Sequence, residues 1–345
     1  MTLIYFIIVL CVTIMVHELG HFLFAKKAGV YVYEFCLGMG PKIFSKKKNE
    51  TEYSIRLFPI GGFVSMAGED LEDGENVPKD RQLCNKSWIW RFMTLIAGIM
   101  FNILLAIIFL FIVGLCNGKP TNPTKISYIE KENYPISELE NIKVGDKITK
   151  INSKKVNSSE MLVLEIAVNS GEIINLEVEH QNGNREVVAV KPILVERNGV
   201  EGYSYGFSLS NDTEKGIIPS IEYAFIQTKN LICQMGKILL YLITGKLGLD
   251  NLSGPLGIFN VVGSAASAGI INIIYLIAYL CINVAIINLI PFPAFDGGRI
   301  LFLFIEKIKG SKVNPKIENT IHTIGFILLM ILMIFVTYND ILRFF

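Results

Sequence analysis

The segment from residue 3 to residue 25 is almost wholly apolar, and it has the length of a membrane-spanning helix. A helix crosses the bilayer core with about 20 apolar residues. Three ionisable side chains nevertheless interrupt the run, namely His17, Glu18 and His21. Ionisable groups inside a membrane span are costly and usually serve a function. Lys26 and Lys27 follow in place of a small-residue cleavage site, so we expect a retained membrane helix that carries a functional site.

The three ionisable residues form an H-E-x-x-H motif. Residues four apart lie on one face of a helix, about 40° apart and about 6 Å along its axis. This spacing allows His17 and His21 to bind one zinc ion, while Glu18 activates a bound water. The simpler alternative is that two histidines in a span only pack or form hydrogen bonds, and the glutamate between them argues against it because of its charge.

The composition is that of a membrane protein. Of the 345 residues, 51% are hydrophobic and only 18% are charged, and the mean hydropathy is +0.46. The net charge of +1 gives no support for a nucleic-acid partner. The six cysteines contain no C-x-x-C pair, so we expect packing residues rather than metal ligands or a disulfide framework.

The fold class expected from these patterns is a polytopic α-helical membrane protein with about four spans. The spans are expected at residues 1–25, 92–116, 269–298 and 321–338. Between them we expect a polar connection with a β-hairpin, a β-rich soluble domain and amphipathic helices at the membrane surface, at residues 26–91, 120–193 and 215–250 respectively.

The hairpin is predicted from strand-like alternation over residues 53–58, followed by a turn and second strand that include Gly61 and Gly62. Its apolar side and its place next to a span suggest that it lies at the bilayer or dips into it. Backbone at that depth must be covered by protein or line a wet cavity. A plain cytosolic hairpin fits the pattern equally well.

The distribution of basic residues predicts the orientation of the spans. Lysines concentrate after the first span and between the last two spans. Basic connections tend to face the cytosol. An even number of spans then places both termini and the soluble domain outside a cell membrane.

A second polar motif lies at the end of the third span. The segment reads Asn288-Leu-Ile-Pro291-Phe-Pro293-Ala-Phe-Asp296-Gly-Gly. Pro291 and Pro293 cannot continue an ordinary helix, so the backbone is expected to open and to present Asp296 at the depth of the two histidines. Two histidines and one aspartate leave the fourth position of a tetrahedral zinc for water, which is the arrangement of a catalytic site.

The two motifs together resemble the site-2 protease family (peptidase M50), the intramembrane zinc metalloproteases. Residues 143–152, which read K-V-G-D-K-I-T-K-I-N, are similar to the G-D-x-I-x-x-I-N signature of a PDZ domain. Residues 61–70 and 251–257 resemble the RseP-type branch, here in the form with a single PDZ domain. Two positions depart from the pattern: Phe295 stands where the family often has leucine, and Ser153 stands where the PDZ segment usually has glycine.

The resemblance implies a Zn²⁺ cofactor held by His17, His21 and Asp296, with Glu18 as general base and later proton donor. Asn288 would hold the substrate backbone or polarise the scissile carbonyl. The opened segment with Pro291 and Pro293, and the hairpin with Gly61 and Gly62, could pair with an extended substrate as added strands.

The implied activity is regulated intramembrane proteolysis in the bacterial cell membrane, with the PDZ domain extracytoplasmic and the active site toward the cytosol. The implied partners are the lipid bilayer and single-pass membrane proteins, such as anti-sigma factors and remnant signal peptides, already shortened by a first cut outside. The PDZ domain could bind a peptide or only filter substrates by size. The alternative function is a non-catalytic membrane scaffold that recruits partners through its PDZ domain, and Asn288 could simply bond a neighbouring helix.

Overall fold

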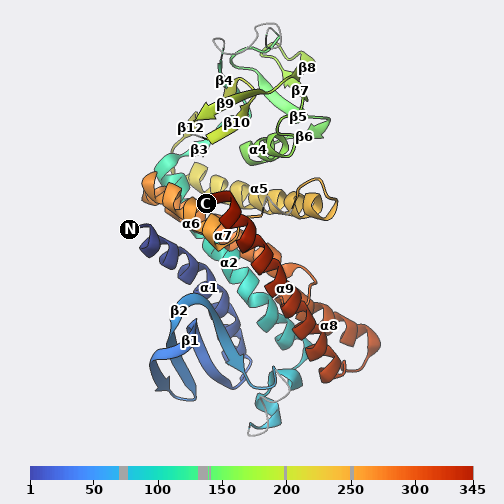
Figure 1. Cartoon of the computed structure of the whole chain (residues 1–345). Helices are drawn as coiled ribbons and strands as arrows, with labels where there is room; N and C mark the ends of the chain where they lie inside the picture. The colour runs from blue at the N-terminus through green and yellow to red at the C-terminus, as the bar shows by residue number, and fades with distance from the viewer. Residues whose placement is uncertain (70–76, 131–138, 140, 198–199, 249–251, 345) are drawn as a thin grey trace. The chain divides into compact units, whose positions relative to one another are not determined.

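A computed structural model describes residues 1–69, 77–130, 139, 141–197, 200–248 and 252–344. Parts of three expected regions, 26–91, 120–193 and 215–250, as well as Asp70 and Asn251 of the quoted motifs, lie outside the described residues. The chain forms two compact units, one made of residues 1–110 and 248–345 and the other of residues 111–247 (Figure 1).

Four helices of the described chain are long and apolar enough to cross a membrane, which confirms the expected number of spans. They are α1 (Thr2–Lys27), α2 (Trp88–Asn117), α7 (Ile270–Leu289) and α9 (Pro315–Phe344). The helix α5 (Ile217–Ile243), rich in polar side chains on one face, is not among them. The protein is therefore helical in its candidate spans and carries its strands between them.

In the first unit, α1 and α2 approach each other closely. A Cβ atom on Gly20 of α1 would lie 2.5 Å from the carbonyl oxygen of Ala97 and 2.9 Å from the Cα atom of Gly98. Only glycine fits at such a crossing, and small residues at helix interfaces are what allow membrane helices to pack backbone to backbone. The glycine in the H-E-x-x-H motif thus fixes the distance between α1 and α2.

The strands β1 (Val32–Lys48) and β2 (Thr51–Met66) form a sheet that folds back on itself beside α1 (Figure 1). Residues 34–37 pair both with residues 62–65 and with residues 52–55, while residues 42–48 pair with residues 51–56. Gly38 and Gly40, at φ of 89° and 86°, allow β1 to bend between these pairings. Residues 62–66, called here the edge segment, consequently lie at one border of the sheet.

The edge segment is attached to α1 through a small apolar core. Val64 and Met66 of the edge segment pack in one cluster with Ala25 of α1. The short helices η1 (Lys79–Arg81) and η2 (Leu83–Asn85) follow, and Leu83 completes the cluster. Burial of these side chains holds the edge segment against the last turns of α1.

The C-terminal part of the first unit contains α6 (Pro255–Ser267), α7, α8 (Asp296–Lys309) and α9. Asp340 of α9 is buried, and its carboxylate accepts a hydrogen bond of 2.8 Å from the backbone N–H of Gly257 at the start of α6. The helix α7 ends at Leu289, as expected from Pro291 and Pro293. The chain then turns through residues 290–295 and begins α8 at Asp296.

The second unit is built on a four-stranded sheet in the order β6, β5, β7, β8. The helix α4 (Ser159–Val168) packs on this sheet, and its N-terminus is capped by the side chain of Ser158, which accepts from the Met161 N–H. The sheet strands are β5 (Lys147–Ile151), β6 (Lys154–Lys155), β7 (Ile174–Glu179) and β8 (Arg185–Val190). The remaining strands of this unit pair two by two, namely β3 (Lys119–Pro120) with β12 (Thr213–Glu214), β4 (Ile126–Ile129) with β11 (Phe207–Leu209), and β9 (Ile193–Arg197) with β10 (Val200–Ser204).

A buried carboxylate joins α4 to α5 within this unit. Glu165 of α4 is fully buried and accepts hydrogen bonds from Tyr241 of α5 at 2.5 Å and from Lys154 at 2.9 Å. Burial alone would raise the pKa of Glu165, but the hydrogen bonds from Tyr241 and Lys154 hold the pKa below its ordinary value. The charged carboxylate is therefore satisfied inside the unit, and it attaches α4 to α5.

Candidate metal centre

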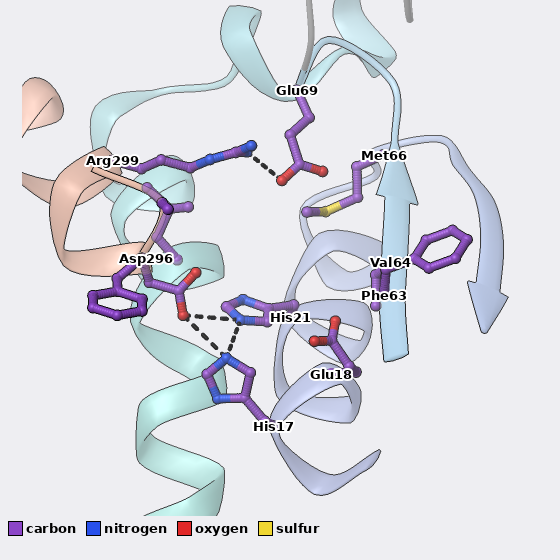
Figure 2. A pocket seen from close by; sticks show the side chains of 12 residues that line it. His17, Glu18, His21, Phe63, Val64, Met66, Glu69, Asp296 and Arg299 are labelled. Atoms are coloured by element: carbon purple, nitrogen blue, oxygen red, sulfur yellow. Dashed lines mark hydrogen bonds and ion pairs between the residues drawn. The ribbon is translucent and has the colours of Figure 1, made fainter. Parts of the chain in front are cut away.

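Three side chains from α1 and α8 converge on one point (Figure 2). His17 and His21 lie one turn apart on α1, and their Nε2 atoms are 3.2 Å apart. The Oδ2 atom of Asp296, at the first residue of α8, lies 3.2 Å from each of these nitrogens. Both histidines are buried. The three residues singled out as metal ligands from the sequence are therefore brought together by the fold.

The donor set fits a zinc ion. Ligand atoms bound to tetrahedral zinc at about 2.0–2.1 Å are separated from one another by about 3.3 Å. The three donor atoms form a triangle with all sides of 3.2 Å, which matches one face of such a tetrahedron. Two imidazoles and one carboxylate are also the kind of ligands that zinc takes in catalytic sites.

The helix α2 orients one of the histidines. The Nδ1 atom of His21 lies 2.8 Å from the carbonyl oxygen of Thr94. Because a carbonyl oxygen can only accept, Nδ1 of His21 carries the proton. The lone pair of its Nε2 atom is then free for a metal ion shared with His17 and Asp296. The Nδ1 atom of His17 is buried and has no hydrogen-bond partner among the described residues.

The residue of α2 that faces the two histidines is a glycine, Gly98, which belongs to none of the motifs described above. A Cβ atom on Gly98 would lie 2.4 Å from the Nε2 atom of His21 and 2.8 Å from the Nδ1 atom of His17. No side chain larger than hydrogen fits at this position without movement of the rings. Gly98 therefore makes the space in which the two imidazoles meet Asp296.

Glu18 lies between the two histidines and the edge segment (Figure 2). Its carboxylate accepts a hydrogen bond from the backbone N–H of Val64. A Cβ atom on Gly62 would lie 3.3 Å from the Cγ2 atom of Ile14 and 3.4 Å from the Cγ atom of Glu18, so the strand passes close to this face of α1. A cavity of about 300 Å³ opens beside these groups, and it is lined by His17, Glu18, His21, Phe63, Val64, Met66, Glu69, Leu95, Ala294, Phe295, Asp296 and Arg299.

A charged pair stands at the side of the cavity opposite Glu18. Arg299, one turn after Asp296 on α8, donates a hydrogen bond to Glu69, which follows the edge segment (Figure 2). Both side chains are partly exposed. The pair links the strand end to the helix that carries Asp296, and only the position of Arg299 three residues after Asp296 could have indicated it in the sequence.

The residues expected to bind substrate are not among the described residues that line the cavity, although Gly62 and Pro293 each adjoin a lining residue in the sequence. Asn288 is in the last turn of α7, and Gly61 precedes the edge segment with φ of 95°. Pro293 packs against α9, where a Cβ atom on Gly325 would lie 2.4 Å from the Pro293 carbonyl oxygen. Pro291 belongs to the same opened segment.

The opened segment is held in place by two close contacts. The backbone N–H of Ala294, at φ of 88°, donates to the Nδ1 atom of His322 on α9 at 3.2 Å. A Cβ atom on Gly297 would lie 2.2 Å from the carbonyl oxygen of Ile290, so this glycine is required for the turn into α8. His322 was not recognised in the sequence because nothing near it resembles a motif.

A transmembrane helix that carries H-E-x-x-H, and a second helix that supplies an aspartate to it, define a membrane-embedded metallopeptidase. The chain belongs to peptidase family M50, whose model matches residues 5–332. This confirms the family resemblance of the sequence motifs.

Known proteins similar to this chain include bacterial zinc metalloproteases. The zinc metalloprotease RasP of Geobacillus kaustophilus is 34% identical over 100% of this chain and 98% of its own length. The regulator of sigma-W protease RasP of Bacillus subtilis is 33% identical over 100% of this chain and 99% of its own. A putative zinc metalloprotease of Clostridium perfringens is 35% identical over 99% of each. The chain is thus a multi-pass bacterial membrane protein and a zinc metalloprotease, with zinc as its cofactor.

Proposed function

We propose that this protein cleaves single-pass membrane proteins within or near the bilayer, toward its cytosolic side. The observation that carries the proposal is the 3.2 Å triangle of donor atoms beside Glu18, built on a helix that is itself a candidate span. A protease tethered to the membrane by a separate anchor would not need its H-E-x-x-H motif inside the anchor.

In the proposed reaction His17, His21 and Asp296 hold the zinc ion, which supplies Lewis acidity toward a water molecule and the peptide carbonyl. Glu18 takes a proton from the attacking water on a carboxylate oxygen and later gives it to the leaving amine. The hydrogen bond from the Val64 N–H orients that carboxylate.

The substrate is proposed to bind as an extended strand next to the edge segment. Residues 62–65 pair with residues 34–37 on one side, and the cavity lies next to them. A helical substrate hides its carbonyls in intrahelical hydrogen bonds, so it must unwind before attack. Gly61 and Gly62 on one side, and Asn288, Pro291 and Pro293 on the other, are proposed to support the unwound backbone by strand addition.

Proline substitutions test this binding mode. Ser65→Pro in the edge segment should lower cleavage because proline removes a backbone donor from the strand. Ser45→Pro, in the part of β1 that pairs with residues 51–56 away from the cavity, serves as the control. Equal cleavage by the two variants at equal protein levels would argue against strand addition.

The second unit is proposed to contain a PDZ domain over residues 120–193, on the extracytoplasmic side. The support is the G-D-K-I-T-K-I-N stretch, whose Asp146 is buried and accepts a hydrogen bond from the Lys143 N–H at 2.8 Å. We propose that this domain controls which substrates approach, either by binding a peptide or by excluding large ectodomains.

The hairpin is proposed to contact the bilayer. The end of the hairpin that lies away from the C-terminus of α1 exposes large apolar side chains: Met39, Ile43, Phe44, Leu57 and Phe58 are more than half exposed. Lys46, Lys47 and Lys48 lie at the other end, next to Glu50, which bonds Lys26 of α1. An apolar end and a basic end suit a hairpin that meets the lipid with the first and the headgroups with the second. The basic residues favour a cytosolic position of the lysine-bearing end.

The substrate class follows from a relative. The Bacillus subtilis relative is named a regulator of sigma-W protease. We therefore propose membrane-bound anti-sigma factors, together with remnant signal peptides, as substrates after a first cut outside the membrane.

A Glu18→Gln variant tests the protease against the alternative of a non-catalytic scaffold. We expect the variant to bind zinc, because all three ligands remain, and to accumulate uncut single-pass fragments in the membrane proteome. Glu214→Gln, which changes an exposed carboxylate in β12, serves as the control. Persistent processing of a model substrate by Glu18→Gln would refute the protease, and zinc binding by a His21→Ala variant equal to wild type would refute the ligand set.

A further inference from the structure

Asn102 is a polar residue in an unexpected environment. It lies within α2, a candidate span, and it is fully buried. Neither its Oδ1 nor its Nδ2 atom has a hydrogen-bond partner among the described residues. A buried amide without partners is costly, and native structures contain few of them. Its presence therefore indicates a task that an apolar residue could not perform.

The buried Nδ1 atom of His17 has the complementary need. Histidines that bind metals almost always donate the hydrogen of their other ring nitrogen to a carbonyl or carboxylate, which fixes the tautomer and the ring orientation. His21 meets this condition through the carbonyl oxygen of Thr94. His17 does not, within the described part of the chain.

The packing of α1 on α2 indicates that Asn102 lies one helical turn beyond the residue that His17 contacts. His21 contacts Thr94, and His17, one turn earlier on α1, lies against Gly98, one turn later on α2. The two helices therefore run in opposite directions here. Asn102 is the next residue on the same face of α2. Side chains on a helix lean toward its N-terminus, which directs the Asn102 amide toward Gly98. Gly98 has no side chain that would separate the amide from the His17 ring.

We propose that Asn102 is a positioning residue of the metal centre. Its amide oxygen accepts a hydrogen bond from one water molecule, which in turn accepts the Nδ1–H of His17. The Nε2 atom of His17 then keeps its lone pair for the metal, as it does in His21. This proposal depends on the metal centre of the proposed function and adds a second contact by which α2 orients it.

The test measures zinc affinity in the purified full-length protein by competition with a chelator. Asn102→Leu has a similar volume but no acceptor, and we expect it to bind zinc about 10- to 100-fold more weakly. Asn102→Asp keeps an acceptor oxygen, and we expect an affinity equal to or above that of wild type. Asn272→Leu changes an exposed asparagine near the start of α7 and should leave zinc affinity unchanged.

The thermal stability of the metal-free protein separates this role from a purely structural one. If Asn102 only packs, removing its unsatisfied amide should leave the stability of Asn102→Leu equal or higher and its zinc affinity unchanged. A folded Asn102→Leu variant with an affinity within twofold of wild type would overturn the proposal. If that variant does not fold, a tenfold loss of affinity in Asn102→Asp would overturn it.

The outcomes also separate this proposal from the one on which it depends. Failure of the wild-type protein to bind zinc would reject the metal centre itself. Zinc binding by wild type that is abolished in His21→Ala, together with full affinity in Asn102→Leu, would reject only the role of Asn102. Neither measurement requires proteolytic activity.

Discussion

Replacing Gly98 by alanine tests how closely α1 and α2 approach each other at the metal centre. The new methyl group would lie 2.4 Å from the Nε2 atom of His21 and 2.8 Å from the Cε1 and Nδ1 atoms of His17. Ordinary contacts begin at 3.4 Å, so the His21 ring must move by about 1 Å, the difference between 2.4 Å and 3.4 Å. That ring cannot move freely, because its Nδ1–H donates a hydrogen bond to the carbonyl oxygen of Thr94.

The expected cost follows from this displacement. Inserting a methyl group into a well-packed site costs about 1–3 kcal/mol, and at about 1.4 kcal/mol per factor of ten this weakens zinc binding by about 5- to 150-fold. Metal–ligand distances tolerate changes of only about 0.2 Å, so a shift of about 1 Å should be felt fully. The higher helix propensity of alanine, about 1 kcal/mol, offsets only part of this cost.

The assay is a chelator competition titration together with cleavage of a model substrate, both on purified full-length protein. Gly236→Ala is the control, because Gly236 lies in the helix α5 and a Cβ atom there would meet nothing within 4 Å. We expect the control to bind and cleave like wild type. If Gly98→Ala did the same, α1 and α2 would have to be farther apart than described, and the reasoning would be wrong.

Three further predictions concern other parts of the chain. Arg299→Glu should lower cleavage about tenfold by placing two carboxylates at the cavity, and combining it with Glu69→Arg should restore most of the activity, measured as a double-mutant cycle. Asp340→Ala should lower the free energy of unfolding by about 1–2 kcal/mol, because the N-terminus of α6 loses its acceptor; unchanged denaturant unfolding would contradict this. The hydrogen bond to Asp146 raises the pKa of His180, so the charged imidazole stabilises the second unit. This contribution is complete below the unfolded pKa of about 6.5 and is lost as the pH rises through the higher folded pKa. The protection of the β7 amides, which is the exchange rate corrected for its intrinsic rise with pH, should therefore fall over that range more in wild type than in a His180→Gln variant.

The sequence predicted the features that depend on local patterns. Hydropathy identified four spans, and H-E-x-x-H with a distant Asp296 identified three side chains that the fold brings within 3.2 Å of one another. The break after α7 followed from Pro291 and Pro293, since proline cannot continue a helix. Family membership is confirmed, whereas the roles of Asn288, the prolines and the PDZ segment stay predictions.

The contribution of α2 could not be predicted in the same way. Its sequence is almost wholly apolar, and the spacing of Thr94, Gly98 and Asn102 at intervals of four marks one face of the helix without indicating which element meets it. Thr94, Gly98 and Asn102 acquire meaning only when that element is known. The fold-back of β1 on β2 was likewise hidden, because it depends on bends at glycines and on pairing between segments distant along the strand.

The division of the metal centre between α1 and α8 has a consequence for the timing of activity during synthesis. His17, Glu18 and His21 leave the ribosome early, whereas Asp296 appears only after the second unit and α7 have been made. A nascent or truncated chain therefore holds the glutamate and two histidines without the carboxylate that completes the site. With the proposed ligand set, proteolysis can begin only once nearly all of the chain has been made, so incomplete copies in the membrane are inert rather than unregulated.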